Sequence, residues 1–315
     1  MVGIAVVVVI VPTKHEPSGG APWIGATTRP SDMLARVSVS LAIASAILFG
    51  VWKFGIGQYR GRVSPYAIVL VTSTVGIAVY LASAWRTDKL MFAPKDVLPG
   101  TVAGICALIA SVVMLKAFQR GKLGVVAGIG ATSGLVPLAY SILIGEALTL
   151  ADMVGIVVIA IGIAVFFLPA MRRKPGETYS VAAIVLSLVA SVFWGLTIVL
   201  EDRGSRVSIP VTVLISLVPQ ILFSAGMLIF VNRSLGGLSR PSLIRLAGAG
   251  VALAVGNVLF FTAANMGDVG VVSVLTGLAP LVVAVLALVF LRERMARSEL
   301  VAMGVTIVGA GLLAI

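Results

Sequence analysis

A few polar and aromatic side chains lie inside the long apolar runs of this sequence, where they could bind a small solute. Polar groups in such runs are costly to bury, and many of them mark the path of a substrate. Asn257 is more informative than a serine or threonine, because a primary amide has more hydrogen-bonding groups than its own helix can satisfy. Its alternative role is a single hydrogen bond between helices, worth about 1 kcal/mol. The other candidate substrate-binding residues are Trp194, Thr132, Ser133, Tyr140, Thr276 and Lys53.

Lys53 is the one charge well inside the first apolar run. Its long side chain either extends to the nearer membrane surface or faces a cavity, where it would attract a carboxylate or a phosphate. Glu201 and Asp202 lie at the end of the sixth apolar run. The sixth run corresponds to the first in the sequence repeat described below, so these two carboxylates are the only acidic groups expected to pair with Lys53. No carboxylate lies in the middle of any run, so the sequence offers no buried carboxylate that could carry a proton through the apolar runs.

Pro137 and Pro280 are predicted to kink their helices, because proline removes one backbone hydrogen bond. The carbonyl that a kink frees either contacts a solute or is satisfied by neighbouring helices, as membrane proteins allow. Aromatic side chains next to glycine, Phe49-Gly50 and Trp194-Gly195, occupy equivalent places in the first and sixth runs. They are candidates for the walls of a cavity, or alternatively for packing.

These elements belong to a sequence repeat. The pattern Ala117, Gly121, Gly124, Val125 and Val126 recurs 146 residues later, from Ala263 to Val272. Each copy continues into an apolar run that contains a proline and ends near a glutamate, Glu146 or Glu293. A pair of Gly/Pro-interrupted apolar segments at corresponding places in two halves is the best sequence indicator of a transporter binding site.

The composition places the chain in a membrane. Hydrophobic residues make up 59% and charged residues 11%, with a mean hydropathy of +1.14, whereas soluble domains carry about 25% charged residues. The net charge of +11 comes from clusters between apolar runs, which does not indicate a nucleic-acid partner. With one cysteine and one histidine, we expect no metal site, no cofactor and no catalytic set, and therefore no enzyme.

We predict an all-α membrane protein of ten transmembrane helices, since each run is about 20 residues long and continuous rather than alternating. Five spans in each copy would make the second copy enter the membrane from the opposite side, so that the repeats are inverted. The expected domains are an N-terminal extension over 1–35, a first repeat over 36–170, a linker over 171–178 and a second repeat over 179–315. The extension is either disordered or lies upstream of the true start at Met33. The predicted spans are 36–58, 64–85, 97–117, 122–144, 151–170, 179–200, 208–231, 243–264, 269–291 and 298–315.

The order of motifs in each copy resembles the EamA-type domain of the drug/metabolite transporter superfamily. The order is Ala-x3-Gly-x2-Gly, then an apolar run that contains a proline, then a glutamate and then Gly-x6-Gly. The resemblance covers roughly residues 36 to 315 and implies a domain carried twice. It also implies a cavity walled by the first, third, fourth, sixth, eighth and ninth spans. The first span departs from the pattern of the small multidrug resistance proteins, because it lacks their proton-exchanging glutamate.

We therefore expect a multi-pass secondary transporter of the cell (inner) membrane that moves a small metabolite, such as an amino-acid-like solute, by alternating access. Its partners would be the solute and the lipid bilayer, and it would act as a monomer or a homodimer. A nucleotide-sugar or sugar-phosphate carrier of the same superfamily is one alternative, and a membrane scaffold that transports nothing is another.

Overall fold

The computed structural model of the chain describes residues 32–87, 94, 97–121, 123–145, 149–171, 181–232 and 238–291, with a few single residues between 301 and 312. Within these ranges every regular element is a helix, so the predicted all-α class is confirmed for the described part. The predicted extension over 1–35 and the linker over 171–178 fall almost wholly outside these ranges.

Eight stretches of the described chain are long and apolar enough to cross a membrane. They correspond to eight of the ten predicted spans. The fifth predicted span is the helix α6 (Leu150–Met171), of which Met153–Gly162 forms a shorter apolar helix. The tenth, 298–315, lies mostly outside the described residues, so the total of ten stays a prediction. The eight stretches are Arg36–Gly57, Pro65–Ser83, Val97–Arg120, Val126–Leu143, Val181–Asp202, Val211–Phe230, Arg240–Met266 and Val269–Phe290.

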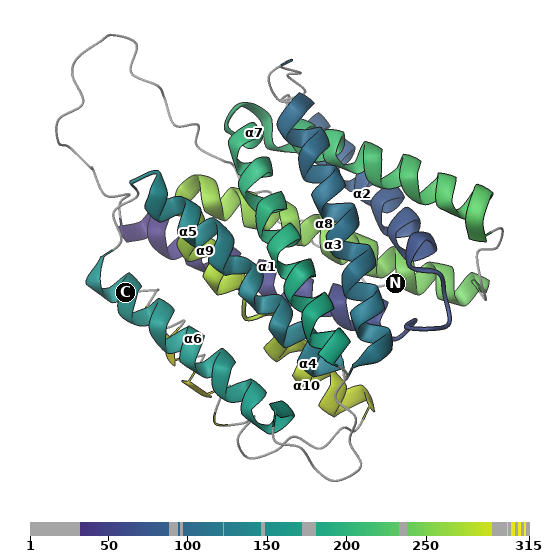
Figure 1. Ribbon diagram of the computed structural model, residues 1–315. Helices are drawn as coiled ribbons and strands as arrows, with labels where there is room; N and C mark the ends of the chain where they lie inside the picture. The colour runs from purple at the N-terminus through teal and green to yellow at the C-terminus, as the bar shows by residue number, and fades with distance from the viewer. Residues whose placement is uncertain are drawn as a thin grey trace.

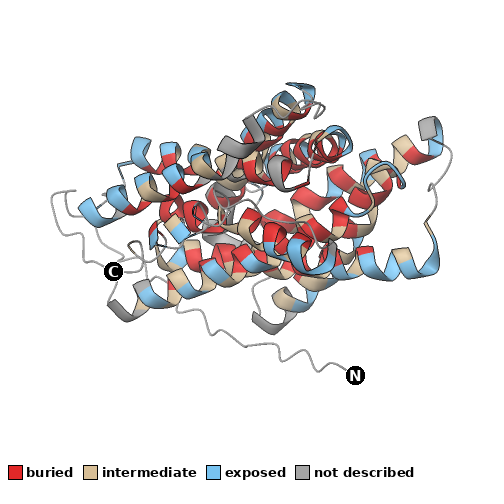
Figure 2. Ribbon diagram, turned by 90° about the horizontal axis from the view of Figure 1, so that it is seen from below, coloured by how far each residue is buried: buried red, intermediate tan, exposed pale blue. Residues whose placement is uncertain are grey.

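Large apolar side chains cover the outside of the bundle. Leu98, Leu143 and Phe230 expose 73%, 84% and 78% of their surface, and Figure 2 shows buried residues where helices face one another and exposed ones on the outward sides. Continuous apolar surface of this kind is rare on soluble monomers and is typical of a lipid-facing surface. The described helices therefore pack a core among themselves and leave an apolar exterior.

Two pairs of long helices form the centre of the bundle. The helix α1 (Asp32–Gly57) packs along α8 (Arg240–Met266), and α3 (Val97–Arg120) packs along α7 (Val181–Met227). The helix α2 (Pro65–Thr87) covers both α7 and α8. In each central pair, one helix comes from the first half of the sequence and one from the second. The halves are therefore interlocked rather than side by side.

The helix α7 turns back on itself, although its helical backbone is continuous over 47 residues. The hydroxyl of Ser216 donates a hydrogen bond of 2.7 Å to the carboxylate of Glu201. A straight helix would separate residues 15 positions apart by about 22 Å. The two ends of this hydrogen bond therefore lie on two different spans, the predicted sixth and seventh. Figure 1 shows the two parts of α7 running in different directions. The short π-helix η3 (Leu228–Asn232) ends the second part.

The fourth and ninth predicted spans are each interrupted. The first consists of α4 (Leu123–Ile129), the 3-10 segment η2 (Gly130–Gly134) and α5 (Leu135–Leu143). The second consists of α9 (Val269–Thr276), a two-residue turn and α10 (Ala279–Leu291). We call them the first and the second broken helix.

The two broken helices cross in opposite directions. In Figure 1, α5 lies beside α9 and α4 lies beside α10, and both pairs are in contact. If the broken helices ran in parallel, α4 would instead face α9. The first half of each broken helix therefore packs on the second half of the other.

Two glycines also show that each half packs on the broken helix of the other half. A Cβ on Gly50 of α1 would lie 2.8 Å from the carbonyl oxygen of Ala279, and a Cβ on Gly195 of α7 would lie 2.6 Å from that of Ser133. Ala279 and Ser133 are 146 residues apart, which is the step of the sequence repeat. Each half thus offers a glycine on its first helix to the broken helix of the other half. The two contacts thus occupy corresponding places in the two halves of the sequence.

Candidate functional site

The break in the first broken helix lies in the interior of the bundle. The sequence GATSG at η2 has two glycines and no strong helix former besides alanine, so it opens the helix at little cost. The carbonyl of Ile129, at the end of α4, accepts hydrogen bonds from the hydroxyls of Thr132 at 2.7 Å and Ser191 at 3.0 Å. These bonds satisfy backbone that a continuous helix would have paired. Ser191 of α7 thereby fixes η2 against the second half of the protein.

Lys53 of α1 extends towards this break. Its Nζ lies 3.8 Å from the position that a Cβ on Gly130 would occupy, and the side chain is half-buried. Among the described residues, no salt bridge or hydrogen bond pairs the ammonium group. Of the two orientations considered from the sequence, the structure has the one in which Lys53 points to the protein interior. Its ammonium does not meet Glu201, which bonds to Ser216 instead.

Two tryptophans meet next to Lys53. Trp52 of α1 and Trp194 of α7 pack edge to face, with ring centroids 5.6 Å apart and planes at 78°. The Nε1 atoms of both rings are buried and have no hydrogen-bond partner among the described residues. The backbones of α1 and α7 make little direct contact, so these two rings bridge the first helices of the two halves.

Ser133 belongs to the same region. In a 3-10 helix, residues three apart lie on the same side, so Ser133 follows Gly130 on the side that faces Lys53. Its side chain is half-buried, and its carbonyl faces Gly195, the neighbour of Trp194. The structure thus places Lys53 against η2 and Trp194 next to Gly195, which faces Ser133 of η2; that these residues bind a solute stays a prediction.

Other predicted residues lie elsewhere on the broken helices. The Thr276 hydroxyl, at the end of α9, donates to the Ser273 carbonyl at 2.9 Å and is buried. Tyr140 is half-buried on α5. Pro137 is the third residue of α5 and Pro280 the second of α10. Both prolines therefore stand in the first turn after a break, where a missing N–H loses no helical hydrogen bond.

Asn257 lies in a second polar cluster with Tyr80 and Glu201. The Tyr80 hydroxyl is buried close to the side chains of Asn257 and Glu201, but it has no hydrogen bond of standard geometry among the described residues. Gln220 accepts a hydrogen bond of 3.3 Å from Ser73 and donates one of 3.0 Å to the Ser216 carbonyl. The cluster thus connects α2, both parts of α7 and α8. Glu201 exposes only 5% of its surface, so this carboxylate is more buried than its place at a span end suggested.

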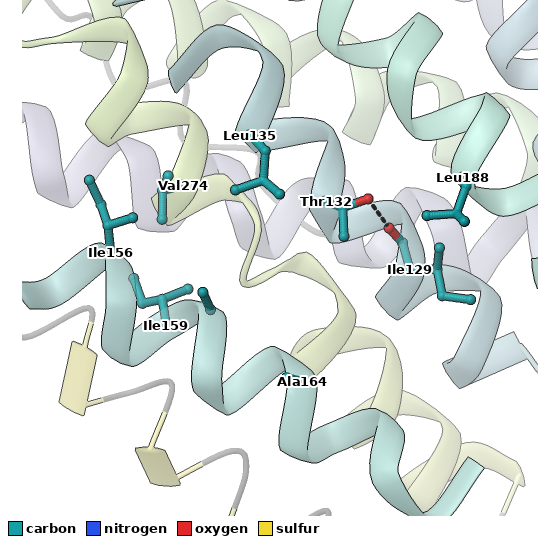
Figure 3. A pocket seen from close by; sticks show the side chains of 10 residues that line it. Ile129, Thr132, Leu135, Ile156, Ile159, Ala164, Leu188 and Val274 are labelled. Atoms are coloured by element: carbon teal, nitrogen blue, oxygen red, sulfur yellow. Dashed lines mark hydrogen bonds between the residues drawn. The ribbon is translucent and has the colours of Figure 1, made fainter. Parts of the chain in front are cut away.

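A cavity of about 240 Å³ separates α6 from the first broken helix. Figure 3 shows its apolar walls, with Ile156 and Ile159 on one side and Leu135 and Leu188 among the residues opposite. Thr132 is its one polar side chain, and the hydroxyl of Thr132 already donates to Ile129. Without a free polar group, this cavity offers no means of orienting a polar solute. The donor groups at η2 are the better candidate.

The aromatic members Trp52 and Tyr80 of these clusters were not among the predicted site residues. Their sequence signal is the same as that of Trp194: an aromatic side chain with a polar atom inside an apolar run. What the sequence lacks is the packing that leaves those polar atoms without a partner.

The arrangement at η2 is suited to binding a solute. Within the described ranges, no three His, Cys, Asp or Glu side chains are close enough to hold a metal ion. The site at η2 presents hydrogen-bond donors and aromatic surface at the place where two discontinuous helices cross, as transporter binding sites do.

Comparison with known proteins decides the family. The sequence profile of the EamA-like transporter family matches residues 36–168 and again 181–315. This chain belongs to the EamA-like transporter family. The resemblance to EamA-type carriers of the drug/metabolite transporter superfamily is thereby confirmed, and the chain is a multi-pass membrane transporter with two EamA repeats.

Two further similarities agree with this family. The uncharacterized protein MJ1333.1 of Methanocaldococcus jannaschii is 27% identical over 128 residues, which are 39% of this chain and 93% of that relative. The relative is therefore about as long as one EamA repeat. A protein of known crystal structure aligns with a TM-score of 0.68 and 19% identity over 87% of this chain and 95% of its own. That similarity supports the fold of the EamA chain described here.

Proposed function

We propose that this EamA protein is a secondary transporter that moves a small organic solute across the inner membrane by alternating access. The observation that carries the proposal is the crossing of the two broken helices, α4–α5 with α9–α10, inside the bundle. Helices that are interrupted in the membrane offer backbone and side-chain groups to a solute at the repeat interface. A continuous bundle would not need interruptions at two corresponding places.

The full architecture in this proposal is ten spans in two inverted five-helix repeats. The antiparallel pairing of the broken helices and the matched approaches of Gly50 and Gly195 support the inversion. Alternating access requires that one repeat rock against the other around a fixed site. The close glycine contacts provide surfaces that are smooth enough for such small displacements.

The solute-binding residues in this proposal are Lys53, Trp194 and Ser133 at η2, with Thr132 and Thr276 supporting the two breaks. Asn257 and Tyr140 are assigned to the path that a solute takes to or from η2. Asn257 belongs there because it borders the Tyr80 hydroxyl, a buried polar group with spare hydrogen-bonding capacity. The protein acts on the location of its solute and not on its covalent bonds.

Two other functions are distinguishable. A nucleotide-sugar or sugar-phosphate carrier would need several cationic groups for its phosphates, and the described structure places the ammonium of Lys53 against η2. A scaffold that transports nothing would have no use for unpaired donors in its interior.

Solute counterflow tests the proposal. Purified protein in liposomes, loaded with an excess of one unlabelled solute, is given the same solute in trace labelled form outside. A carrier accumulates label transiently because exchange is faster than net efflux. A panel of organic acids, amino acids, amines and sugar phosphates would yield counterflow with at least one class. Absence of counterflow across the whole panel would contradict transport and favour the scaffold.

A further inference from the structure

Three hydrogen-bond donors lie on α1 and α7 in the region of η2. The buried indole N–H groups of Trp52 and Trp194 have no partner among the described residues. The ammonium of the half-buried Lys53 lies against Gly130 and makes no hydrogen bond or salt bridge with a described residue. A buried amide-like group without a partner costs roughly 1–3 kcal/mol, and an unpaired charge costs more. Packing alone does not explain three such groups on two helices from opposite halves. They indicate a ligand that supplies the acceptors.

The protein's own acceptors near these donors are already in use. The carbonyl of Ile129 accepts from both Thr132 and Ser191. Glu201, the carboxylate that repeat symmetry would have offered to Lys53, accepts from Ser216 next to Tyr80. Neither Ile129 nor Glu201 thus serves as the acceptor for these donors, and a bound solute could supply it.

We infer that the solute is a small organic acid whose carboxylate binds Lys53 and the indole N–H groups, while its apolar body packs on the rings of Trp52 and Trp194. This inference rests on the proposed transport function and names the class of its substrate. A carboxylate has two oxygens with about four acceptor positions, which suffices for one ammonium and two N–H donors. A charge-assisted hydrogen bond to Lys53 is also about twice as strong as a neutral one.

Charge balance favours a monoanion over other solutes. The one ammonium at η2 neutralises one negative charge, whereas a phosphate monoester carries about two and is usually held by several cationic groups. A cationic amine would be repelled by Lys53. An amino acid would bring an ammonium group for which no described acidic side chain is present at η2. The two aromatic rings suit an apolar body, since aromatic walls are common in sites for such ligands.

Matched ligands test the inference in the full-length protein. The protein is placed in nanodiscs of phosphatidylcholine, and its thermal stability is measured with benzoate, benzamide and benzylammonium, and with propionate, propionamide and alanine. Benzamide, benzylammonium and propionamide replace the carboxylate of the matching acid, whereas alanine keeps the carboxylate of propionate and adds an ammonium group. We expect the acids to raise the melting temperature in a saturable way, because a ligand that binds the folded state stabilises it. The amides, benzylammonium and the zwitterion alanine should leave it unchanged.

Substitutions then locate the binding. Lys53→Gln should weaken acid binding roughly tenfold or more, which corresponds to the loss of a charge-assisted hydrogen bond. Lys53→Arg should retain most of it. Trp194→Phe keeps a ring but removes one donor, and should weaken binding by about fivefold. Lys116→Gln, at an exposed position on α3, removes the same charge far from η2 and should have no effect.

The possible outcomes separate the inference from the proposed function. Three results would each overturn the assignment of an organic acid. The first is an equal rise in melting temperature with acids and amides, the second is no acid-specific rise with either set, and the third is undiminished acid binding by Lys53→Gln. If counterflow of another solute class persists in that case, transport stands and only the substrate class is wrong. A rise in melting temperature with phosphatidylglycerol in the nanodisc that abolishes the benzoate shift would identify a lipid headgroup as the occupant and would also overturn it.

Discussion

Trp52 and Trp194 pack edge to face at 5.6 Å although they belong to different repeats and are 142 positions apart in the chain. Edge-to-face contacts add about 0.5–1.5 kcal/mol beyond the apolar area that they bury. The contact therefore ties the first helix of one half to the first helix of the other. It also places two indole N–H groups in an interior without acceptors for them, so the same pair combines a packing contact with spare binding capacity.

The two properties of Trp194 can be separated by substitution. Trp194→Phe should change the unfolding free energy by less than about 1 kcal/mol, because the N–H that it removes makes no hydrogen bond in the described structure. Trp194→Ala should cost about 3–5 kcal/mol through the loss of a large packed ring. Thermal unfolding of the two variants in the same detergent measures the difference. Equal destabilisation by both would show that the indole N–H has a structural partner.

Lys53→Met should stabilise the protein in the absence of solute. The substitution replaces an unpaired, half-buried charge by an apolar side chain of similar length, so we expect a gain of about 1 kcal/mol or more in unfolding free energy. Counterflow should fall in the same variant. This opposite change in stability and activity is typical of a residue kept for function.

Lys116→Met is the control for Lys53→Met, since Lys116 is exposed on α3. It should alter neither stability nor counterflow. A lower melting temperature of Lys53→Met than of the wild type would mean that the ammonium makes a stabilising contact and would contradict the unpaired charge.

Gly50→Ala and Gly195→Ala should have matching effects, because each places a methyl group against a carbonyl oxygen of the opposite broken helix. Overpacking of this kind costs about 1–3 kcal/mol, and both variants should lose counterflow. Gly226→Ala, on the same helix as Gly195, meets nothing within 4 Å and should be neutral or stabilising. Thermal unfolding and counterflow measure the three together. Strong loss in only one of the first two would contradict the correspondence between the two contacts.

Transport should not be driven by protons, since Glu201 lies at a span end and bonds to Ser216, away from η2. An imposed pH gradient across proteoliposomes should therefore produce no uphill accumulation, and Glu201→Gln should retain counterflow. The prediction is contradicted if a protonophore abolishes uphill accumulation of the solute and if this accumulation disappears in Glu201→Gln but not in Lys53→Gln. That result would assign the coupling of transport to protons to Glu201. The comparison of Glu201→Gln with Lys53→Gln is needed because Glu201 is buried and a buried carboxylate is a common proton carrier in transporters.

The sequence predicted the helical class, eight of the spans and the two interrupted helices, because apolar run length and Gly/Pro positions are local properties. It could not give the place of the breaks. The predicted kinks were at Pro137 and Pro280, whereas the helices open just before them, at η2 and at Gly277 and Leu278. Proline is easily accommodated in the first turn that follows a break, so it indicates the next helix start rather than the bend itself.

The site was only partly accessible from the sequence for a different reason. Lys53 and Trp194 could be selected because polar atoms in apolar runs are costly. Whether such an atom finds a partner depends on contacts between segments far apart in the chain. Thus Glu201 turns to Ser216 across a helix reversal, while Lys53 reaches Gly130 and finds no acceptor among the described residues. Likewise, the contact of Asn257 with Tyr80 joins two helices far apart in the sequence.

Access to η2 from both sides of the membrane is the central claim, and one cysteine can report it. Ser133→Cys on a Cys106→Ala background carries a single thiol at the break, since Cys106 is the one cysteine of the chain. The rate of its reaction with a membrane-impermeant maleimide is measured in proteoliposomes, with the reagent added outside or trapped inside. An alternating-access carrier predicts labelling from either side, slowed by the transported solute. Labelling from one side only, or from neither, would contradict alternating access at η2.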